Sequence, residues 1–261
     1  MSFEIIDFHC HPFRIPGENI CAHISYTEMN PERTEKMYDD LGVSRFCGSV
    51  ILNRSLPHPT WEELKSLNDE ALALAEFYGG KYIPGFHVHP KYVDESLAEI
   101  ERMAEKGVKL IGELVPYMHG WSPEDFVSDG FTRILRSATE HGMVVSFHSG
   151  GEDFMDEMVR KNPDTVFVAA HPGEREQFDR HLARMKMSEN YYLDISASNI
   201  LRYGLLRHGI TECGKERFLF GTDFPTCNPP AFIGCVMHDD QLTDDERKAV
   251  FADNAKKLLG L

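Results

Sequence analysis

The chain has 261 residues, of which 42% are hydrophobic and 26% are charged, values typical of a globular protein with a sizeable apolar core. We expect one domain over residues 1–261, because α/β barrels of this length form single domains. The formal net charge of −15 makes the average surface repel nucleic acid and anionic membranes. A small-molecule substrate is therefore favoured over either of these partners.

The six cysteines are scattered and form no Cys-x-x-Cys pair, and the residues at the start form no basic, apolar leader. No apolar run approaches the roughly 18 residues that a membrane-spanning helix needs. We therefore expect reduced thiols, a cytoplasmic location and no membrane partner.

The first predicted element is an apolar strand, Ile5 to His11, that ends in a His-x-His pair. Side chains alternate between the two faces of a strand, so His9 and His11 can direct both imidazoles to one ion. The long loop that follows, 12–30, is typical of a lid or binding loop, which makes Arg14, His23 and Tyr26 candidates for substrate contact. A helix is expected over about 31–41.

Strands and helices alternate through the rest of the chain. The expected strands cover 44–52, 81–88, 108–115, 143–148, 165–170, 191–195 and 217–221, and the expected helices cover 60–78, 93–106, 122–142, 152–161, 174–187, 200–213 and 243–259. Eight such units predict a distorted (β/α)8 TIM barrel with a parallel sheet. An open doubly wound sheet is the alternative, but no Gly-rich phosphate turn follows the first strand.

In a TIM barrel the functional site lies at the carboxyl ends of the strands. Six residues that can bind metal are expected at that rim: His9, His11, Glu113, His148, His171 and Asp223. Taken singly, each has an ordinary explanation as a turn former, a helix cap or a paired carboxylate. Taken together they predict a divalent metal site, with zinc expected first and manganese or iron(II) as alternatives.

Other rim residues are expected to contact substrate. They are Arg14, Arg54, His87, His89, Tyr117, His119 and Asn199, and they include a second His-x-His pair after the third strand. In contrast, His141, His181 and His208 fall within or at the ends of predicted helices, where we expect solvated or capping side chains.

Five motifs resemble those of the amidohydrolase superfamily, specifically the amidohydrolase-related, metal-dependent hydrolases with a TIM-barrel fold. They are Asp7-Phe8-His9-Cys10-His11, Phe147-His148-Ser149-Gly150, Ala170-His171-Pro172-Gly173, the run from Phe220 to Pro225 and the run from Asn254 to Leu259. The resemblance implies a metal held by His9, His11, His148 and Asp223. It also implies that Asp223 shuttles protons and that His171 binds a second ion or contacts substrate.

The chain departs from many relatives at the fourth strand, where they carry a carboxylated lysine and this sequence has Glu113. Lys109 on the same strand is expected to lie too deep to replace it. If Glu113 reaches the ions it bridges two of them, with His148 and His171 on the second; if not, a single ion remains.

The resemblance leads first to a metal-dependent hydrolase of a small ester, lactone or amide. In that reaction a metal-activated water attacks, Asp223 moves the proton and His171 polarises the carbonyl. The alternative is a non-hydrolytic decarboxylase similar to the aminocarboxymuconate-semialdehyde decarboxylase group, for which Arg14, Arg54 or Arg202 could bind a carboxylate. A TatD-like nuclease agrees less well with the net charge of −15. The resemblance also implies a homo-oligomer.

Overall fold

The computed structural model describes residues 3–22, 29–197 and 199–261. Eight parallel strands follow one another around a single sheet in the order β1 to β8. The strands are β1 Ile5–Asp7, β2 Val43–Gly48, β3 Tyr82–Phe86, β4 Leu110–Leu114, β5 Val144–His148, β6 Val166–Ala170, β7 Tyr191–Asp194 and β8 Phe218–Leu219. The backbone amide of Phe8 donates to the carbonyl oxygen of Phe220 at 2.8 Å, which joins the first strand to the last. The predicted TIM barrel is confirmed.

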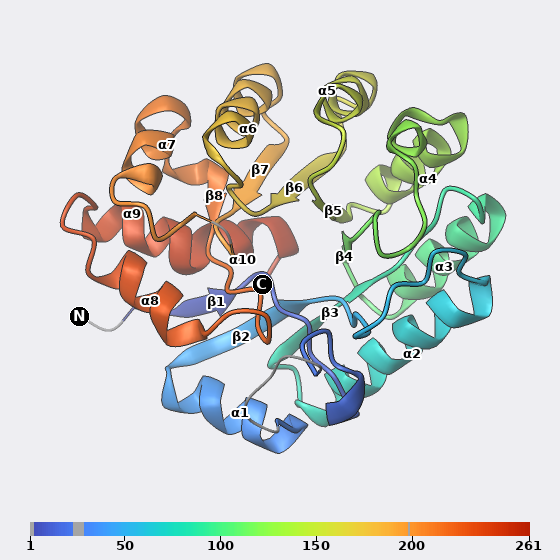
Figure 1. The fold of residues 1–261 in the computed structure, drawn as a ribbon, viewed down its shortest axis with the longest axis horizontal. Coiled ribbons are helices and arrows are strands. Elements are labelled where there is room, and N and C mark those ends of the chain that lie inside the picture. Colours follow the sequence, from blue (N-terminus) through green and yellow to red (C-terminus); the bar gives the residue numbers. More distant parts are fainter. Residues whose placement is uncertain (1–2, 23–28, 198) are drawn as a thin grey trace.

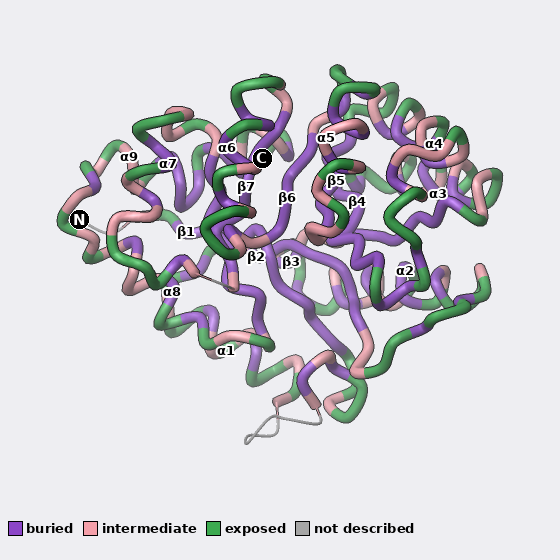
Figure 2. The backbone as a smooth tube through the Cα atoms, turned by 45° about the horizontal axis from the view of Figure 1, so that its top comes forward, coloured by how far each residue is buried: buried purple, intermediate pink, exposed green. Residues whose placement is uncertain are grey.

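Helices surround the strands (Figure 1). They are α1 Pro31–Asp40, α2 Trp61–Phe77, α3 Val93–Glu105, α4 Asp129–Glu140, α5 Glu152–Lys161, α6 Arg175–Met187, α7 Leu205–Cys213, α8 Pro229–Met237, α9 Asp244–Lys248 and α10 Asn254–Leu259. Those up to α7 follow one another around the barrel in chain order. In Figure 2, residues along the strands are buried, and exposed residues lie mainly on the outward turns of the helices. This pattern is typical of amphipathic helices that pack on a buried sheet.

The helices differ from the prediction in four places. The predicted helix 122–142 is a 3-10 segment, Pro123–Val127, followed by α4, and the predicted helix 200–213 begins only at Leu205, as α7. The sequence pattern placed no helix between 222 and 242, whereas the structure has α8, which begins with Pro229 and Pro230 in the first turn, where proline is tolerated. The last predicted helix, 243–259, is divided into α9 and α10 by a π-helical segment, Ala249–Asp253.

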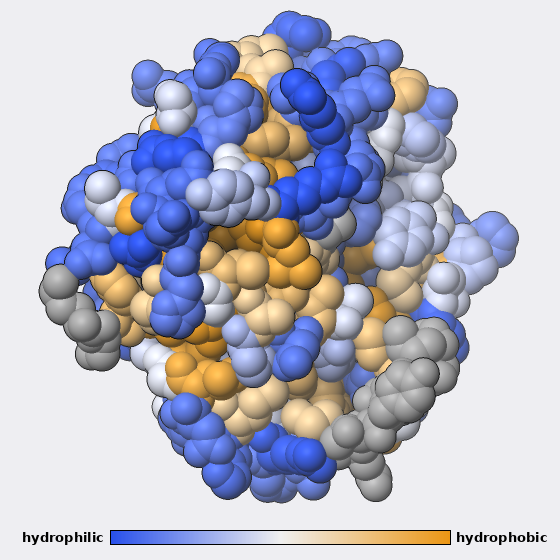
Figure 3. Space-filling model, turned by 60° about the vertical axis from the view of Figure 1, so that its left-hand side comes forward, coloured by the Kyte–Doolittle hydropathy of each residue, from blue (hydrophilic) through white to orange (hydrophobic). Residues whose placement is uncertain are grey.

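The helix α8 carries no charged residue, and two large apolar side chains on the loop before α7, Leu201 and Tyr203, are exposed. Apolar residues gather in the middle of the face that Figure 3 shows, on the side where α7, α8 and α9 lie. Among the described residues, no helix is long and apolar enough to cross a bilayer.

One apolar layer fills the interior of the barrel with a side chain from each strand. Its members are Ile6, Cys47, Ile83, Leu110, Val144, Val168, Tyr192 and Leu219, and residues of the C-terminal helical segment, Ala252, Ala255 and Leu259, pack against it. Because side chains alternate along a strand, the next inward positions lie two residues further on. On six strands these positions hold small residues: Ser49, Gly85, Gly112, Ser146, Ala170 and Gly221.

This layer of small residues leaves space for larger polar side chains at the carboxyl ends of the strands. A Cβ atom at Gly85 would clash with the carbonyl oxygen of Gly112, and one at Gly221 would lie 2.8 Å from Cβ of His9. The apolar layer thus forms the floor of a polar site.

Candidate metal centre

The first strand and the segment after β8 are joined through Asp7, whose side chain is fully buried. Its carboxylate accepts hydrogen bonds from Thr222 N at 2.9 Å, Thr222 Oγ1 at 2.5 Å and the Tyr38 hydroxyl at 2.8 Å. Burial raises the pKa of Asp7 to about 6, while these hydrogen bonds act in the opposite direction. The backbone amide of Asp223 donates to the carbonyl oxygen of His9 at 2.7 Å. These bonds place the strand-eight carboxylate beside the first His-x-His pair.

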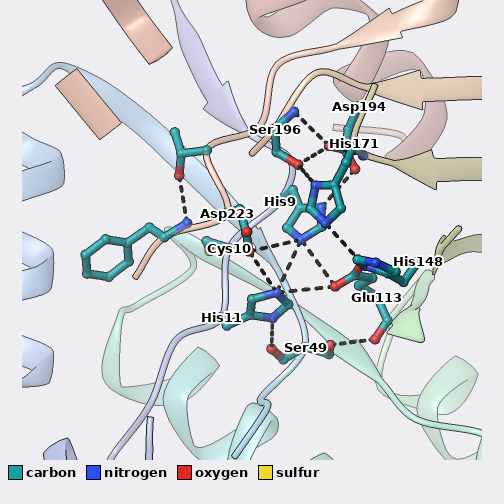
Figure 4. Close-up of polar contacts among 12 residues, drawn as sticks. His9, Cys10, His11, Ser49, Glu113, His148, His171, Asp194, Ser196 and Asp223 are labelled. Carbon is teal, nitrogen blue, oxygen red and sulfur yellow. Dashed lines mark hydrogen bonds and ion pairs between the residues drawn. The ribbon is translucent and has the colours of Figure 1, made fainter. Parts of the chain in front are cut away.

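Four side chains converge at this end of the barrel (Figure 4). The Nε2 atoms of His9 and His11 lie 3.2 Å apart, and Glu113 Oε2 is 3.3 Å from each of them. Asp223 Oδ1 lies 3.6 Å from Nε2 of His9 and 3.3 Å from Nε2 of His11. In a tetrahedral zinc site with metal–nitrogen distances of about 2.0 Å, two ligand atoms lie about 3.3 Å apart. These donors therefore fit a divalent ion held between them.

The other ring nitrogens of the same two histidines contact acceptors. Nδ1 of His9 lies 2.8 Å from Oδ2 of the buried Asp194, and Nδ1 of His11 lies 3.0 Å from the carbonyl oxygen of Ser49. Metal-binding histidines usually donate their second N–H in this way, which fixes the ring and directs the free nitrogen to the ion.

A second group of donors surrounds the other oxygen of Glu113. Its Oε1 is 3.0 Å from Nδ1 of His148 and 3.6 Å from Nε2 of His171. Both of these histidines are partly exposed, and their rings meet at 4.9 Å between centroids. Glu113 thus lies between the two donor groups, in the position that the sequence analysis described for a bridging residue.

Charge balance within the centre depends on these close contacts. Burial alone would lower the pKa of His9, but the carboxylates of Asp194 and Glu113 outweigh it and raise this pKa well above its ordinary value. Burial alone would raise the pKa of Glu113, but the charge of His9 and hydrogen bonds with His11 and His148 hold it well below its usual range. Glu113 is therefore ionised, and the donor chemistry suits a divalent cation.

The backbone is also strained at this rim. Among the described residues, four non-glycine residues have positive φ: His171 at 68°, Ala197 at 47°, Asn199 at 73° and Asp223 at 63°. All four follow β6, β7 or β8. Such strain is uncommon outside glycine and clusters at functional sites, which agrees with the position of the two donor groups.

The six metal-ligand candidates from the sequence are thus brought together, but two polar residues beside them were missed. Asp194 contacts His9, and Ser196 Oγ lies 2.9 Å from Nδ1 of His171. The predicted strand 191–195 placed Asp194 inside an apolar run. The rule that selected residues at the other strand ends could have found it at the end of β7.

Three of the expected substrate contacts are buried and already bonded or packed within the protein. His87 Nε2 contacts the carbonyl oxygen of Val50 at 2.8 Å, and His89 Nε2 contacts that of His119 at 2.9 Å. The rings of His87 and His119 meet edge to face at 4.8 Å. Substrate contact by these three histidines stays a prediction.

The remaining rim candidates lie at different distances from the centre. Tyr117 is 64% exposed and its ring is 5.1 Å from that of His148, which places it at the mouth of the site. Asn199 donates to the carbonyl oxygen of Gly173 at 2.6 Å. Arg14 and Arg54 are exposed, and Arg14 lines a surface groove between α1 and α2. The other loop candidates, His23 and Tyr26, lie outside the described residues.

The prediction that His181 is solvated or caps a helix is wrong. It is fully buried, with Nδ1 2.8 Å from the Tyr191 hydroxyl and Nε2 3.3 Å from Ser149 Oγ. The inward face of α6 carries it against the sheet, a placement that helical position alone does not reveal.

The sequence model of the amidohydrolase family matches residues 6–261. The chain belongs to this family. Together with the donor groups described above, the match makes the protein a metal-dependent enzyme of the amidohydrolase superfamily. Among proteins of curated function, none matches the chain significantly.

Several solved structures share the amidohydrolase barrel over nearly their whole length. The 2,6-dihydroxybenzoate decarboxylase from Rhizobium has 14% identity and a TM-score of 0.79, with 99% of both chains covered. A dihydroxybenzoic acid decarboxylase from Polaromonas, with bound manganese and 2-nitroresorcinol, has 13% identity and a TM-score of 0.78, covering 100% of this chain and 98% of that chain. The 5-carboxyvanillate decarboxylase from Novosphingobium aromaticivorans, in complex with manganese and a nitrobenzoic acid, has 14% identity and a TM-score of 0.74. The match covers 100% of this chain and 97% of that chain. At these identities the similarity establishes a common fold.

Proposed function

We propose that this amidohydrolase-family enzyme is a metal-dependent decarboxylase of a small aromatic carboxylic acid. The strongest support is that the barrel resembles metal-dependent decarboxylases over its whole length. In addition, the carboxyl ends of its own strands carry a donor set of the kind that binds manganese or zinc. This is the alternative that the sequence analysis set beside hydrolysis.

In the proposed reaction, His9, His11 and Asp223 would hold a divalent ion, with Glu113 as a further ligand. The ion would supply a positive charge that orients the substrate carboxylate and stabilises charge that develops on the ring. Asp223 would deliver a proton to the ring carbon that carries the carboxylate. As that C–H bond forms, the C–C bond breaks, its electron pair returns to the ring and carbon dioxide leaves.

The surroundings of the centre agree with an aromatic substrate. The exposed ring of Tyr117 lies over His148 at the mouth, where it offers a face for an aromatic ring. Among the described residues, no lysine or arginine forms an ion pair with Glu113, Asp194 or Asp223. In the proposed reaction the substrate carboxylate would bind the metal.

Hydrolysis is the second candidate, and the position of Glu113 favours it. A carboxylate with one oxygen facing His9 and His11 and the other facing His148 and His171 can bridge two ions. Two ions would suit activation of a water for attack on an ester, lactone or amide, with Asp223 taking the water's proton and passing it to the leaving group.

The two reactions can be separated with metal-loaded protein and defined probes. We expect 2,6-dihydroxybenzoate or 5-carboxyvanillate to release carbon dioxide, and in D2O the product should carry deuterium on the ring carbon that lost the carboxylate. Asp223→Asn should abolish this release while the protein still folds. No carbon dioxide from either acid, with incorporation of 18O from labelled water into the products of an ester and lactone panel, would replace decarboxylation by hydrolysis.

A further inference from the structure

Asp194 at the end of β7 contacts the side chain of His9 directly and the side chain of His171 through Ser196 (Figure 4). Its Oδ2 lies 2.8 Å from Nδ1 of His9. Its Oδ1 accepts hydrogen bonds from the backbone amide of Ser196 at 3.0 Å and from the Ser196 hydroxyl. The Ser196 Oγ in turn lies 2.9 Å from Nδ1 of His171. Asp194 and Ser196 are both fully buried.

The direction of each hydrogen bond follows from what the groups can donate. A backbone amide only donates, so Oδ1 of Asp194 is an acceptor, and an ionised carboxylate only accepts at both oxygens. The Ser196 hydroxyl therefore gives its hydrogen to Asp194 and has only lone pairs left for His171. Nδ1 of His171 must then carry the hydrogen of that bond, and Nδ1 of His9 must carry the hydrogen of its bond to Asp194.

We propose that Asp194 is a positioning residue that fixes the tautomers of His9 and, through Ser196, of His171. An imidazole that binds a metal is neutral and has one N–H, so a hydrogen on Nδ1 leaves the lone pair of Nε2 for the ion. The lone pairs of His9 and His171 then point at opposite oxygens of Glu113, from which they lie 3.3 and 3.6 Å. One buried carboxylate thus prepares both sides of the centre.

This assignment deepens the proposed function and rests on its metal centre. Since neutral His171 presents a lone pair at Nε2, it serves as a ligand or a base and not as the proton donor. The acid that protonates the substrate is then Asp223, which contacts neither Asp194 nor Ser196 through a hydrogen bond in the described structure.

A purely structural role for Asp194 would have different consequences. Asp194 joins β7 to β1 through His9 and to the segment after β6 through the amide of His171, 3.5 Å away. Its loss would then lower thermal stability while the tautomers and the metal affinity stayed unchanged. The experiment must therefore read out tautomers and metal affinity, in addition to stability.

The test combines long-range 1H–15N correlation of histidine rings with calorimetric titration of Zn2+ into the full-length, chelator-treated protein. In the Zn2+-loaded wild type we expect Nδ1–H tautomers for both His9 and His171. Asp194→Asn should disturb both rings and weaken Zn2+ binding about 10- to 100-fold, the range found for partners of metal-binding histidines. Ser196→Ala should disturb His171 alone, and Ser196→Thr should restore it, because the hydroxyl returns.

Ser149→Ala is the matched control, since Ser149 follows His148 directly but bonds to His181. It should leave both tautomers and the affinity for Zn2+ as in the wild type. Wild-type tautomers in Ser196→Ala, together with an affinity change below twofold in Asp194→Asn, would overturn the assignment. If the wild type itself bound no Zn2+, the proposed function would fail, while the Nδ1–H signals of both rings would still test the role of Asp194 in the metal-free protein.

Discussion

The Nε2 atoms of His9 and His11 lie 3.2 Å apart, and each of these rings has an acceptor at its other nitrogen. With hydrogens on both Nδ1 atoms, two lone pairs face each other and the Oε2 of Glu113, 3.3 Å from each. Lone pairs and a carboxylate at this separation repel one another unless a proton or a metal ion lies among them, and the raised pKa of His9 reflects this demand for positive charge. The geometry therefore links metal binding to the stability of the barrel.

Removing the metal is expected to destabilise the protein. A ligand that binds only the folded state stabilises it by about 4 kcal/mol at a thousand times its Kd, which for a chain of this size raises Tm by roughly 10 °C. Calorimetry of protein before and after chelation, with ion content verified, should show this fall, and added Mn2+ or Zn2+ should reverse it. An unchanged Tm after verified removal would speak against the centre.

Glu113→Gln is expected to lower the number of bound ions or weaken their binding at least about tenfold, because the amide loses the negative charge and one acceptor oxygen. Glu99→Gln is the matched control, since both glutamates are 3% exposed but Glu99 pairs with Arg102 on α3. Elemental analysis of both variants should show a loss for Glu113→Gln alone. Equal metal content in the two variants would exclude Glu113 from the centre.

Gly85→Ala is expected to disrupt the barrel beneath the centre. The new methyl group would clash with the carbonyl oxygen of Gly112, which is backbone and cannot move aside. We expect a loss of several kcal/mol in the free energy of unfolding, or failure to fold, in urea titrations. At Gly234 of α8 nothing lies within 4 Å of an added Cβ, so Gly234→Ala should be neutral or stabilise the protein by up to about 1 kcal/mol. Similar effects of the two substitutions would contradict the packing described for the floor of the site.

Acid should destabilise the protein through His181. Burial, followed by the positive charge of Arg184, lowers its pKa to about 3 in the folded state from an ordinary value of 6.5. Below pH 6.5 the unfolded chain therefore binds a proton that the folded chain does not, and stability falls as the pH falls towards 3. Between pH 6.5 and 5 this group should account for about 2 kcal/mol.

Urea unfolding of His181→Gln at several pH values tests whether His181 makes the protein less stable in acid. Its stability should fall less steeply with acid than that of the wild type, whereas the same change at the exposed His141 should leave the slope unaltered. Loss of metal at low pH affects all three proteins, so the difference between their slopes isolates His181. Equal slopes in His181→Gln and the wild type would contradict the folded-state pKa.

Much of the barrel could be predicted because each strand is a short apolar run and each helix has a 3.6-residue repeat. The His-x-His pair at His9 and His11 could be placed on one face from strand alternation alone. The end of the predicted strand could have marked Asp194 as a rim residue, but its contact with His9 becomes visible only when the barrel brings β7 beside that histidine. The helix α8 was missed for another reason: its charge-free sequence after Pro229 and Pro230 has no polar face to mark a helical period.

Anomalous diffraction from crystals of the Mn2+-loaded enzyme would test the central claim most directly, because it locates bound ions without any assumption about the reaction. We expect a peak about 2.0 to 2.3 Å from Nε2 of His9, Nε2 of His11 and the carboxylate of Asp223, with Glu113 in contact with it. A second peak beside His148 and His171 would favour hydrolysis over decarboxylation. The absence of any peak among His9, His11 and Asp223 in fully loaded crystals would contradict the metal centre on which the proposed function depends.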